Sequence, residues 1–190
     1  MPAKLSTYVA LLRGINVTGH NRVPMNVLAE IFASLGCTEV KTYIASGNVV
    51  FKAPAAKLKT LGAKVTSEIG RQCGCEPAVM FRTAEQMAEV VRMNPFLKPG
   101  MEENWFHVCF LERVPDPNKF VTLDPKEFLP DNFELVGDVL YLLLPNGVAE
   151  SKLARMDLRR KLGVVNTVRN WRTVKTLAEL ASSAKGNDAI

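Results

Sequence analysis

Histidine and cysteine are scarce in this chain, and this scarcity argues against a metal centre. The sequence contains two histidines, His20 and His107, and four cysteines, Cys37, Cys73, Cys75 and Cys109. Zinc sites usually need three or four Cys or His ligands, and Cys73-Gly74-Cys75 is the one close pair available. We therefore expect no metal site, and we expect the cysteines to be free, buried thiols.

Long apolar runs are also missing. No stretch reaches the roughly 18 consecutive apolar residues that a membrane span requires, and the N-terminus runs directly into a first apolar strand, which leaves no room for a signal sequence. Hydrophobic residues make up 47% and charged residues 23%, which is ordinary for a globular protein. We expect a cytoplasmic protein with no membrane partner, and 190 residues allow one substantial domain or two small ones.

The sequence contains few motifs that indicate catalysis. No polar cluster pairs two carboxylates, and neither Ser46 nor Ser151 has an evident histidine to activate it. The run Gly147-x-x-x-Ser151-Lys152 lacks the GxxxxGK[ST] spacing of a P-loop. Whether the protein is an enzyme stays open, and the sequence names no cofactor.

The N-terminal part predicts the order βαββαβ of a ferredoxin-like unit. A helix opened by Pro24 carries apolar residues at helical spacing, and Ser46-Gly47 has the composition of a hairpin turn. The predicted strands are Thr7–Leu12, Glu39–Ala45, Asn48–Lys52 and Glu76–Phe81.

The same order recurs after a turn-rich boundary at Asn94–Gly100. Thr83-Ala-Glu-Gln86 is a capping-box pattern that predicts a connecting helix before this boundary. The later predicted elements are strands at Trp105–Leu111, Phe133–Val136, Val139–Leu144 and Val164–Val168, a short helical segment within Pro117–Phe128, a helix from Ser151 to Gly163, and a last helix from near Asn170. We expect an α+β duplication of two packed ferredoxin-like halves, 1–95 with the connecting helix and 96–190 with an extra C-terminal helix.

Four polar clusters are predicted at strand ends or helix starts, where unpaired backbone amides favour anions. They are Arg13-Gly14 with Asn16 and the loop to Arg22, Ser46-Gly47-Asn48, Asn146-Gly147 with Ser151-Lys152, and Thr167–Trp171. Each cluster has a plainer interpretation as well, because Ser151 and Asn170 are good helix caps and Asn48 is a good turn residue. Trp171 is either a core anchor, which we favour, or a stacking surface.

Several of these motifs together resemble a known family. Ala10–Val17 (ALLRGINV), Val23-Pro-Met25, Thr42–Phe51 (TYIASGNVVF), Asn94-Pro-Phe96 and Thr167–Trp171 (TVRNW) look like the domain-of-unknown-function family 1697 of uncharacterised bacterial cytoplasmic proteins. The resemblance implies two ferredoxin-like halves and no established activity. It also implies one ligand-binding set: Arg13, Gly14, Asn16, Ser46, Gly47, Asn48, Ser151, Lys152, Arg169, Asn170 and Trp171. This chain has Thr18 where the family usually has glycine and Val168 where it commonly has alanine.

Our first hypothesis is that these clusters converge on a cleft that binds an anionic small molecule, such as a nucleotide or a phosphorylated metabolite. The alternative is nucleic-acid binding through the basic region 151–176, where Asp157 is the only acidic residue. A structural or interaction module ranks third. An enzyme acting on a phosphorylated or carboxylate substrate, with Lys152 or Ser46 in the chemistry, ranks last. The sequence leaves the oligomeric state open.

Overall fold

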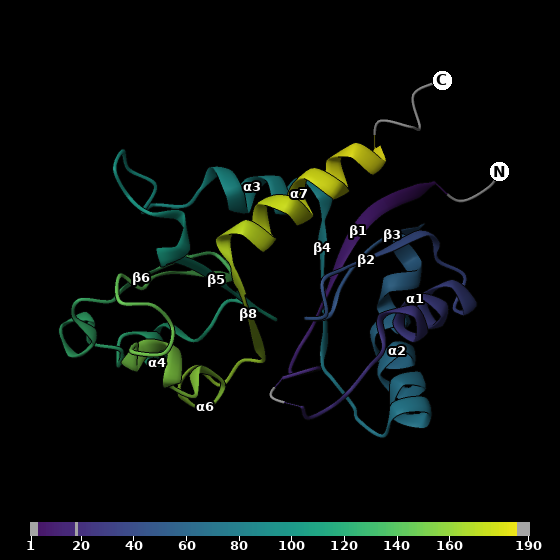
Figure 1. The fold of residues 1–190 in the computed structure, drawn as a ribbon, viewed down its shortest axis with the longest axis horizontal. Helices are drawn as coiled ribbons and strands as arrows, with labels where there is room; N and C mark the ends of the chain where they lie inside the picture. Colours follow the sequence, from purple (N-terminus) through teal and green to yellow (C-terminus); the bar gives the residue numbers. More distant parts are fainter. Residues whose placement is uncertain (1–3, 18, 186–190) are drawn as a thin grey trace. The chain divides into compact units, whose positions relative to one another are not determined.

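A computed structural model of the protein describes residues 4–17 and 19–185. The described residues form two compact units (Figure 1). Unit 1 comprises those within Met1–Glu89 and Thr176–Ile190, and unit 2 is Val90–Lys175. Each unit contains a four-stranded antiparallel sheet and helices, so the α+β class with two ferredoxin-like halves is confirmed. The assignment of 1–95 and 96–190 as separate domains stays a prediction.

The sheet of unit 1 has the strand order β2-β3-β1-β4, with β1 in the interior. Its elements are β1 (Leu5–Leu12), α1 (Met25–Ser34), β2 (Thr38–Tyr43), β3 (Asn48–Pro54), the 3-10 turn η1 (Ala55–Lys57), α2 (Leu58–Cys73), β4 (Val79–Thr83) and α3 (Ala84–Arg92). Helices α1 and α2 lie side by side against one face of this sheet (Figure 1). Six consecutive residues of β1 are buried, which explains why its sequence is an unbroken apolar run rather than an alternating one.

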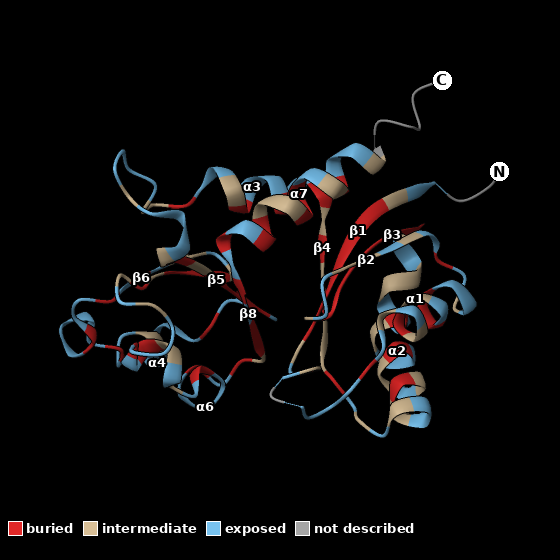
Figure 2. Cartoon of the chain, viewed as in Figure 1, coloured by how far each residue is buried: buried red, intermediate tan, exposed pale blue. Residues whose placement is uncertain are grey.

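The core of unit 1 is centred on Phe51 of β3. Its ring lies 5.1 Å from Phe32 of α1, 5.8 Å from Tyr8 of β1 and 5.9 Å from Phe81 of β4, measured between centroids. The buried residues of α1 and α2 face this cluster, as their helical spacing predicts (Figure 2). The core therefore holds the sheet and both helices together around one aromatic ring.

Unit 2 repeats the topology with the strand order β6-β7-β5-β8. Its elements are η2 (Glu103–Trp105), β5 (Phe106–Leu111), α4 (Pro117–Phe120), η3 (Pro125–Phe128), β6 (Asn132–Val136), β7 (Val139–Leu143), α5 (Lys152–Arg155), α6 (Leu158–Leu162), β8 (Asn166–Asn170) and the start of α7 (Trp171–Lys185), whose described residues from Thr176 onward belong to unit 1. Phe133 packs edge-on against Phe120 and Phe128. Short helices thus occupy the places that α1 and α2 hold in unit 1.

Two local predictions were wrong. The single helix expected from Ser151 to Gly163 is two short helices, because Met156 is extended (φ −69°, ψ 138°) and Asp157 caps α6 by accepting a hydrogen bond from the Arg160 amide at 3.1 Å. The turn between β2 and β3 spans four residues, Ile44–Gly47, rather than the two of Ser46-Gly47. At α6 the backbone conformation follows from the Asp157 cap, and in the β2–β3 turn it follows from the left-handed residues Ile44 and Gly47. The apolar pattern does not determine it in either place.

The predicted helix caps at Thr83, Ser151 and Asn170 are confirmed, whereas Pro24 precedes α1 instead of being its first residue. Thr83 and Gln86 form a reciprocal capping box, with bonds of 2.9 and 3.1 Å. The Ser151 hydroxyl accepts from the Ala154 amide at 2.8 Å, and Asn170 Oδ1 accepts from the Thr173 amide at 2.8 Å. None of the helices in the described part of the chain is long and apolar enough to cross a membrane.

Candidate functional site

The first two polar clusters meet at one end of the sheet of unit 1. The Leu12 amide, at the end of β1, donates to the Gly47 carbonyl in the β2–β3 turn at 2.9 Å. The next amide, that of Arg13, donates to the Ala78 carbonyl just before β4 at 2.9 Å. The loop after β1 is therefore held between its two neighbouring strands, and Arg13 starts it as a partly exposed side chain.

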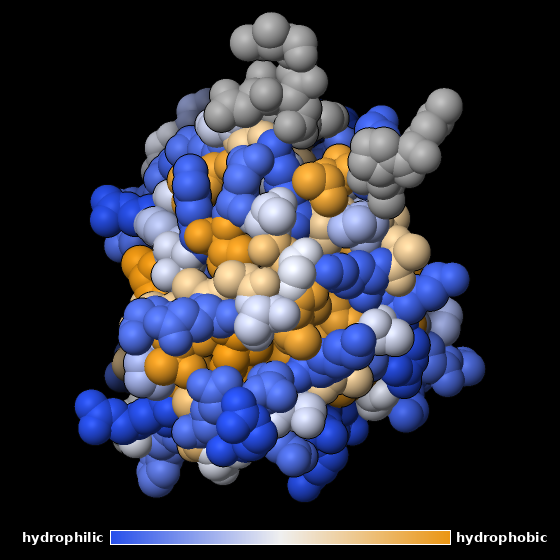
Figure 3. Space-filling model, turned by 90° about the vertical axis from the view of Figure 1, so that its right-hand side faces the viewer, coloured by the Kyte–Doolittle hydropathy of each residue, from blue (hydrophilic) through white to orange (hydrophobic). Residues whose placement is uncertain are grey.

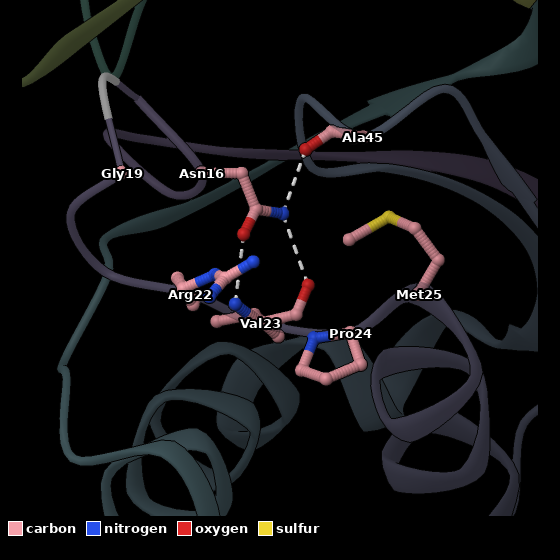
Figure 4. A pocket seen from close by; sticks show the side chains of 7 residues that line it. All are labelled: Asn16, Gly19, Arg22, Val23, Pro24, Met25 and Ala45. Carbon is pink, nitrogen blue, oxygen red and sulfur yellow. Dashed lines mark hydrogen bonds between the residues drawn. The ribbon is translucent and has the colours of Figure 1, made fainter.

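Asn16 connects this loop to the segment before α1 and to the β2–β3 turn (Figure 4). Its Oδ1 accepts from the Val23 amide at 2.8 Å, while its Nδ2 donates to the carbonyls of Val23 and Ala45 at 2.9 and 2.8 Å. The backbone of Asn16 is left-handed, with φ 54°, a conformation that asparagine tolerates better than most residues. Asn16 therefore closes the loop onto the start of α1 and onto the β2–β3 turn.

Gly47 is the point at which the turn and the loop touch most closely. A Cβ atom at this position would lie 2.9 Å from Leu12 Cβ and 2.9 Å from Ile15 Cδ1, and the backbone has φ 76°. Both the conformation and the contact require glycine. Beside it, buried Asn48 donates to the Tyr43 carbonyl at 3.1 Å and to the Ser46 hydroxyl at 2.9 Å, which fixes the turn from within.

An open pocket of about 740 Å³ lies between the loop, the turn and the start of α1. Its lining, which we call the loop pocket, is Asn16, Gly19, Arg22, Val23, Pro24, Met25 and Ala45. In Figure 4 the Met25 side chain extends from the beginning of α1 toward Asn16 and Ala45, and the Arg22 side chain lies beside Val23. The volume is within the range of small-molecule sites. Thr18, which departs from the family pattern, lies outside the described residues.

The electrostatic setting of the loop pocket is positive. Residues 5–29 contain no aspartate or glutamate, and neither do residues 40–67. Helix α1 has no acidic residue in its first turn, and Pro24 offers no side-chain cap to its first amides. At the opposite end of α1, Lys57 Nζ donates to the carbonyls of Leu35 and Gly36 at 2.8 and 2.7 Å. Arg22 and the positive end of α1 would therefore both favour an anion in the loop pocket.

The polar side chains of the third and fourth clusters are engaged within unit 2. Ser151 and Asn170 cap α5 and α7, which is their plainer interpretation. Trp171 is 1% exposed and packs edge-on against Phe106 at 6.3 Å, so its ring is a core anchor. Lys152, at the start of α5, is exposed. These residues belong to a different unit from the loop pocket, and the expected convergence of all four clusters stays a prediction.

Arg169 is a buried cation. Its guanidinium Nη1 donates to the Thr167 hydroxyl at 2.7 Å and to the Val168 carbonyl at 2.9 Å. Burial lowers the pKa of Arg169 to about 10, so the side chain still carries its charge at neutral pH. Sequence reasoning singled out Arg169 but missed Arg82, which is equally buried and donates from Nη1 to the Phe81 carbonyl at 2.9 Å. The signal was available, because each arginine directly precedes a helix-capping residue.

Neither histidine lies in an arrangement typical of general acid–base catalysis. His20 is exposed in the loop after β1. His107 lies on β5, and burial lowers the pKa of its imidazole, which a backbone hydrogen bond at Trp105 partly opposes. Within residues 4–17 and 19–185, no three His, Cys, Asp or Glu side chains are grouped so that they could hold a metal ion. The four cysteines are free thiols, but only Cys37 and Cys109 are buried as expected, and Cys73 and Cys75 are partly exposed.

These features define an α+β protein of two ferredoxin-like halves, with an open pocket at one end of the first sheet. The chain belongs to the protein family of unknown function DUF1697, whose family model matches residues 5–141. This match includes the whole loop pocket and ends before Ser151, so the third and fourth clusters lie beyond it.

One solved structure with a similar fold is that of a conserved bacterial protein, SP0830 from Streptococcus pneumoniae. It matches with a TM-score of 0.69 and 18% sequence identity, over 94% of this chain and 99% of that one. At this identity the likeness concerns the fold. No curated protein matches the chain.

Proposed function

We propose that the protein binds an anionic small molecule in the loop pocket. The observation that carries the proposal is a small-molecule-sized hollow bordered by Arg22 and by the start of α1, in two stretches of chain that contain no acidic residue. Nucleotides and phosphorylated metabolites are the first candidates, because backbone amides at a helix start favour phosphate oxygens.

The residues of the first two clusters have different roles in this proposal. Arg22 and Arg13 supply positive charge, and Asn16 forms part of the wall while holding the loop in place. Gly14, with φ 68°, keeps the backbone beside Arg13 free of a side chain. Ser46, Gly47 and Asn48 set the turn that presents Ala45 to the pocket. A role for Ser151, Lys152, Arg169, Asn170 and Trp171 in ligand binding is a separate prediction about unit 2.

The test is a titration of the full chain with ATP and with inorganic phosphate, followed by amide chemical shifts. We expect saturable shifts at residues 13–26 and 44–48, and a loss of affinity of about tenfold in Arg22→Gln, because hydrogen bonds to charged groups contribute about 1.5–3 kcal/mol. The matched control is Arg71→Gln, which removes an exposed arginine that pairs with Glu68 on α2. The proposal would be overturned if neither ATP nor phosphate shifted these amides, or if Arg22→Gln bound these anions with the affinity of the unmodified protein.

A second candidate function rests on the basic surface of α5 and α6. Five residues between positions 152 and 161 are exposed cations: Lys152, Arg155, Arg159, Arg160 and Lys161. The one carboxylate among them, Asp157, already accepts the hydrogen bond that caps α6. Such a surface favours a polyanion such as RNA or DNA.

This candidate is tested by salt-dependent binding to single-stranded and double-stranded RNA and DNA. Arg159→Glu/Arg160→Glu should weaken binding and flatten its salt dependence, whereas Lys59→Glu/Lys64→Glu, which changes two exposed cations of α2, should change it little. No binding at low salt would remove the candidate.

A further inference from the structure

The loop pocket is polar at one point and apolar over most of its lining. Val23, Pro24, Met25 and Ala45 present carbon atoms, and Gly19 adds no side chain. Asn16 contributes an amide whose two N–H groups are both donated to backbone carbonyls, at Val23 and Ala45. Among the described residues that line the loop pocket, Arg22 is therefore the one with an ionic side chain, and most of the others are apolar.

The apolar character continues onto the surface around the pocket. Val17, next to Asn16, is 55% exposed, and Ile44, next to Ala45, is 50% exposed. Ile44 has a left-handed backbone with φ 46°, which is unusual and unfavourable for a β-branched residue. On the face of the molecule that Figure 3 shows, apolar side chains also lie open to solvent between hydrophilic ones. A ligand that met these carbon surfaces would gain from burying apolar area.

We infer that the ligand of the loop pocket is an amphiphilic anion: one carboxylate or phosphate group joined directly to a compact apolar body, such as an aromatic or branched aliphatic carboxylate. The anionic group pairs with Arg22 near the start of α1. The apolar body lies against Met25, Pro24 and Ala45. A sugar phosphate fits poorly, because its hydroxyls would face carbon atoms and lose their hydrogen bonds to water. This inference rests on the proposed binding of an anion, and it moves the ligand class away from nucleotides and sugar phosphates toward apolar acids.

Three probes separate the two contributions. Phenylacetate carries both the charge and the ring, acetate carries the charge alone, and phenylacetamide carries the ring alone. We expect phenylacetate to shift the amides of residues 16–25 and 45 of the full chain at millimolar concentration. We expect acetate and phenylacetamide to bind at least about tenfold more weakly, since each lacks one of the two interactions.

Variants locate each contribution. Arg22→Gln should weaken phenylacetate about tenfold and leave phenylacetamide unchanged. Met25→Gln, which keeps the length of the side chain but makes it polar, should weaken both ring-bearing probes several-fold. The control is Met93→Ser, which alters an exposed methionine of unit 2. Amide spectra of each variant report whether it is folded, and the probe series on the unmodified chain decides the question if Met25→Gln is not.

The outcomes separate this inference from the proposed function. If acetate and phosphate bind as well as phenylacetate, the amphiphilic class is wrong and anion binding stands. If phenylacetamide binds as well as phenylacetate, the charge is irrelevant and both are wrong. If none of the three probes binds while ATP does, the amphiphilic class is again wrong.

Discussion

Arg82 and Arg169 occupy the same position in the two sheets. Each is the penultimate residue of the last strand of its unit, and each is paired in register with a valine of the first strand, Val9 or Val108. In both, Nη1 donates to the carbonyl of the preceding residue at 2.9 Å. The next residue, Thr83 or Asn170, caps the following helix. The duplication thus extends beyond topology to a repeated strand–arginine–cap–helix unit.

Loss of either arginine should destabilise the fold. Arg169→Ala leaves the Thr167 hydroxyl and the Val168 carbonyl without this donor and opens a void, so we expect a fall of about 2–4 kcal/mol in the free energy of unfolding. Urea denaturation measures this free energy of unfolding. Arg172→Ala, at an exposed neighbour on α7, should change the free energy of unfolding by less than about 0.5 kcal/mol. Equal effects of the two substitutions would contradict the assigned role.

Asn16 should be costly to replace. Asn16→Gly keeps the left-handed backbone but removes three hydrogen bonds, for an expected loss of about 2–4 kcal/mol in unfolding free energy. Asn16→Ala removes the same bonds and adds the strain of φ 54°, roughly 1 kcal/mol more. Thermal denaturation of the pair isolates the backbone term. An alanine variant as stable as the glycine variant would show that the loop relaxes out of the left-handed region.

Gly47 and Gly147 form a natural comparison. Their φ values are 76° and 78°, but a Cβ at Gly147 would meet nothing within 4 Å, whereas one at Gly47 would lie 2.9 Å from Leu12 Cβ. Gly147→Ala should therefore cost about 1 kcal/mol from backbone strain alone. Gly47→Ala should cost about 1–3 kcal/mol beyond that, because the loop and the turn must separate. The denaturant midpoints of the two variants measure these costs. Similar losses of stability in both would mean that Leu12 and Ile15 move away from a Cβ at position 47 at little cost.

The pH dependence of stability should include a contribution from His107. Burial lowers its pKa below the ordinary 6.5, so below that pH the unfolded chain binds more protons at this site than the folded protein does. The contribution to stability is therefore present above pH 6.5 and is lost as the pH falls toward the lowered pKa.

The two histidines make this testable. Urea midpoints measured from pH 5 to pH 8 should show a weaker fall at low pH in His107→Gln than in the unmodified protein. His20→Gln, at the exposed second histidine, should keep the original profile. If His107→Gln keeps it as well, acidic groups alone account for the pH dependence.

The sequence predicted the fold well because the periodic signals agree with the packing. The apolar run of β1, the helical spacing of α1 and α2, and the caps at Thr83, Ser151 and Asn170 each have a local cause. The break between α5 and α6 was missed because the apolar spacing continues through Met156, while the Asp157 cap ends that continuity. Helix propensity alone does not show whether the apolar spacing or the Asp157 cap determines the backbone there.

The candidate site was predicted only in part. The loop after β1 and the Ser46–Asn48 turn do lie together within unit 1, where Asn16 bonds to Ala45 and Leu12 to Gly47, but their role in ligand binding stays a prediction. Arg22 was placed in the first polar cluster but left out of the ligand-binding set, and Met25 and Ala45 were not singled out because both are apolar. Which apolar side chains line a hollow depends on how a loop closes, and a hydrogen bond between positions 29 residues apart sets that closure.

Lys57 gives helix α1 a one-sided electric field. The ammonium group of Lys57 donates hydrogen bonds to the carbonyls of Leu35 and Gly36, so its charge largely neutralises the negative end of the helix dipole. The positive end beside Pro24 is then not offset by the negative end. A solute approaching α1 from the side of the loop is thus sorted by the sign of its charge before its shape matters. Replacing one lysine more than thirty positions away from Pro24 would soften that preference without touching a single atom of the pocket wall.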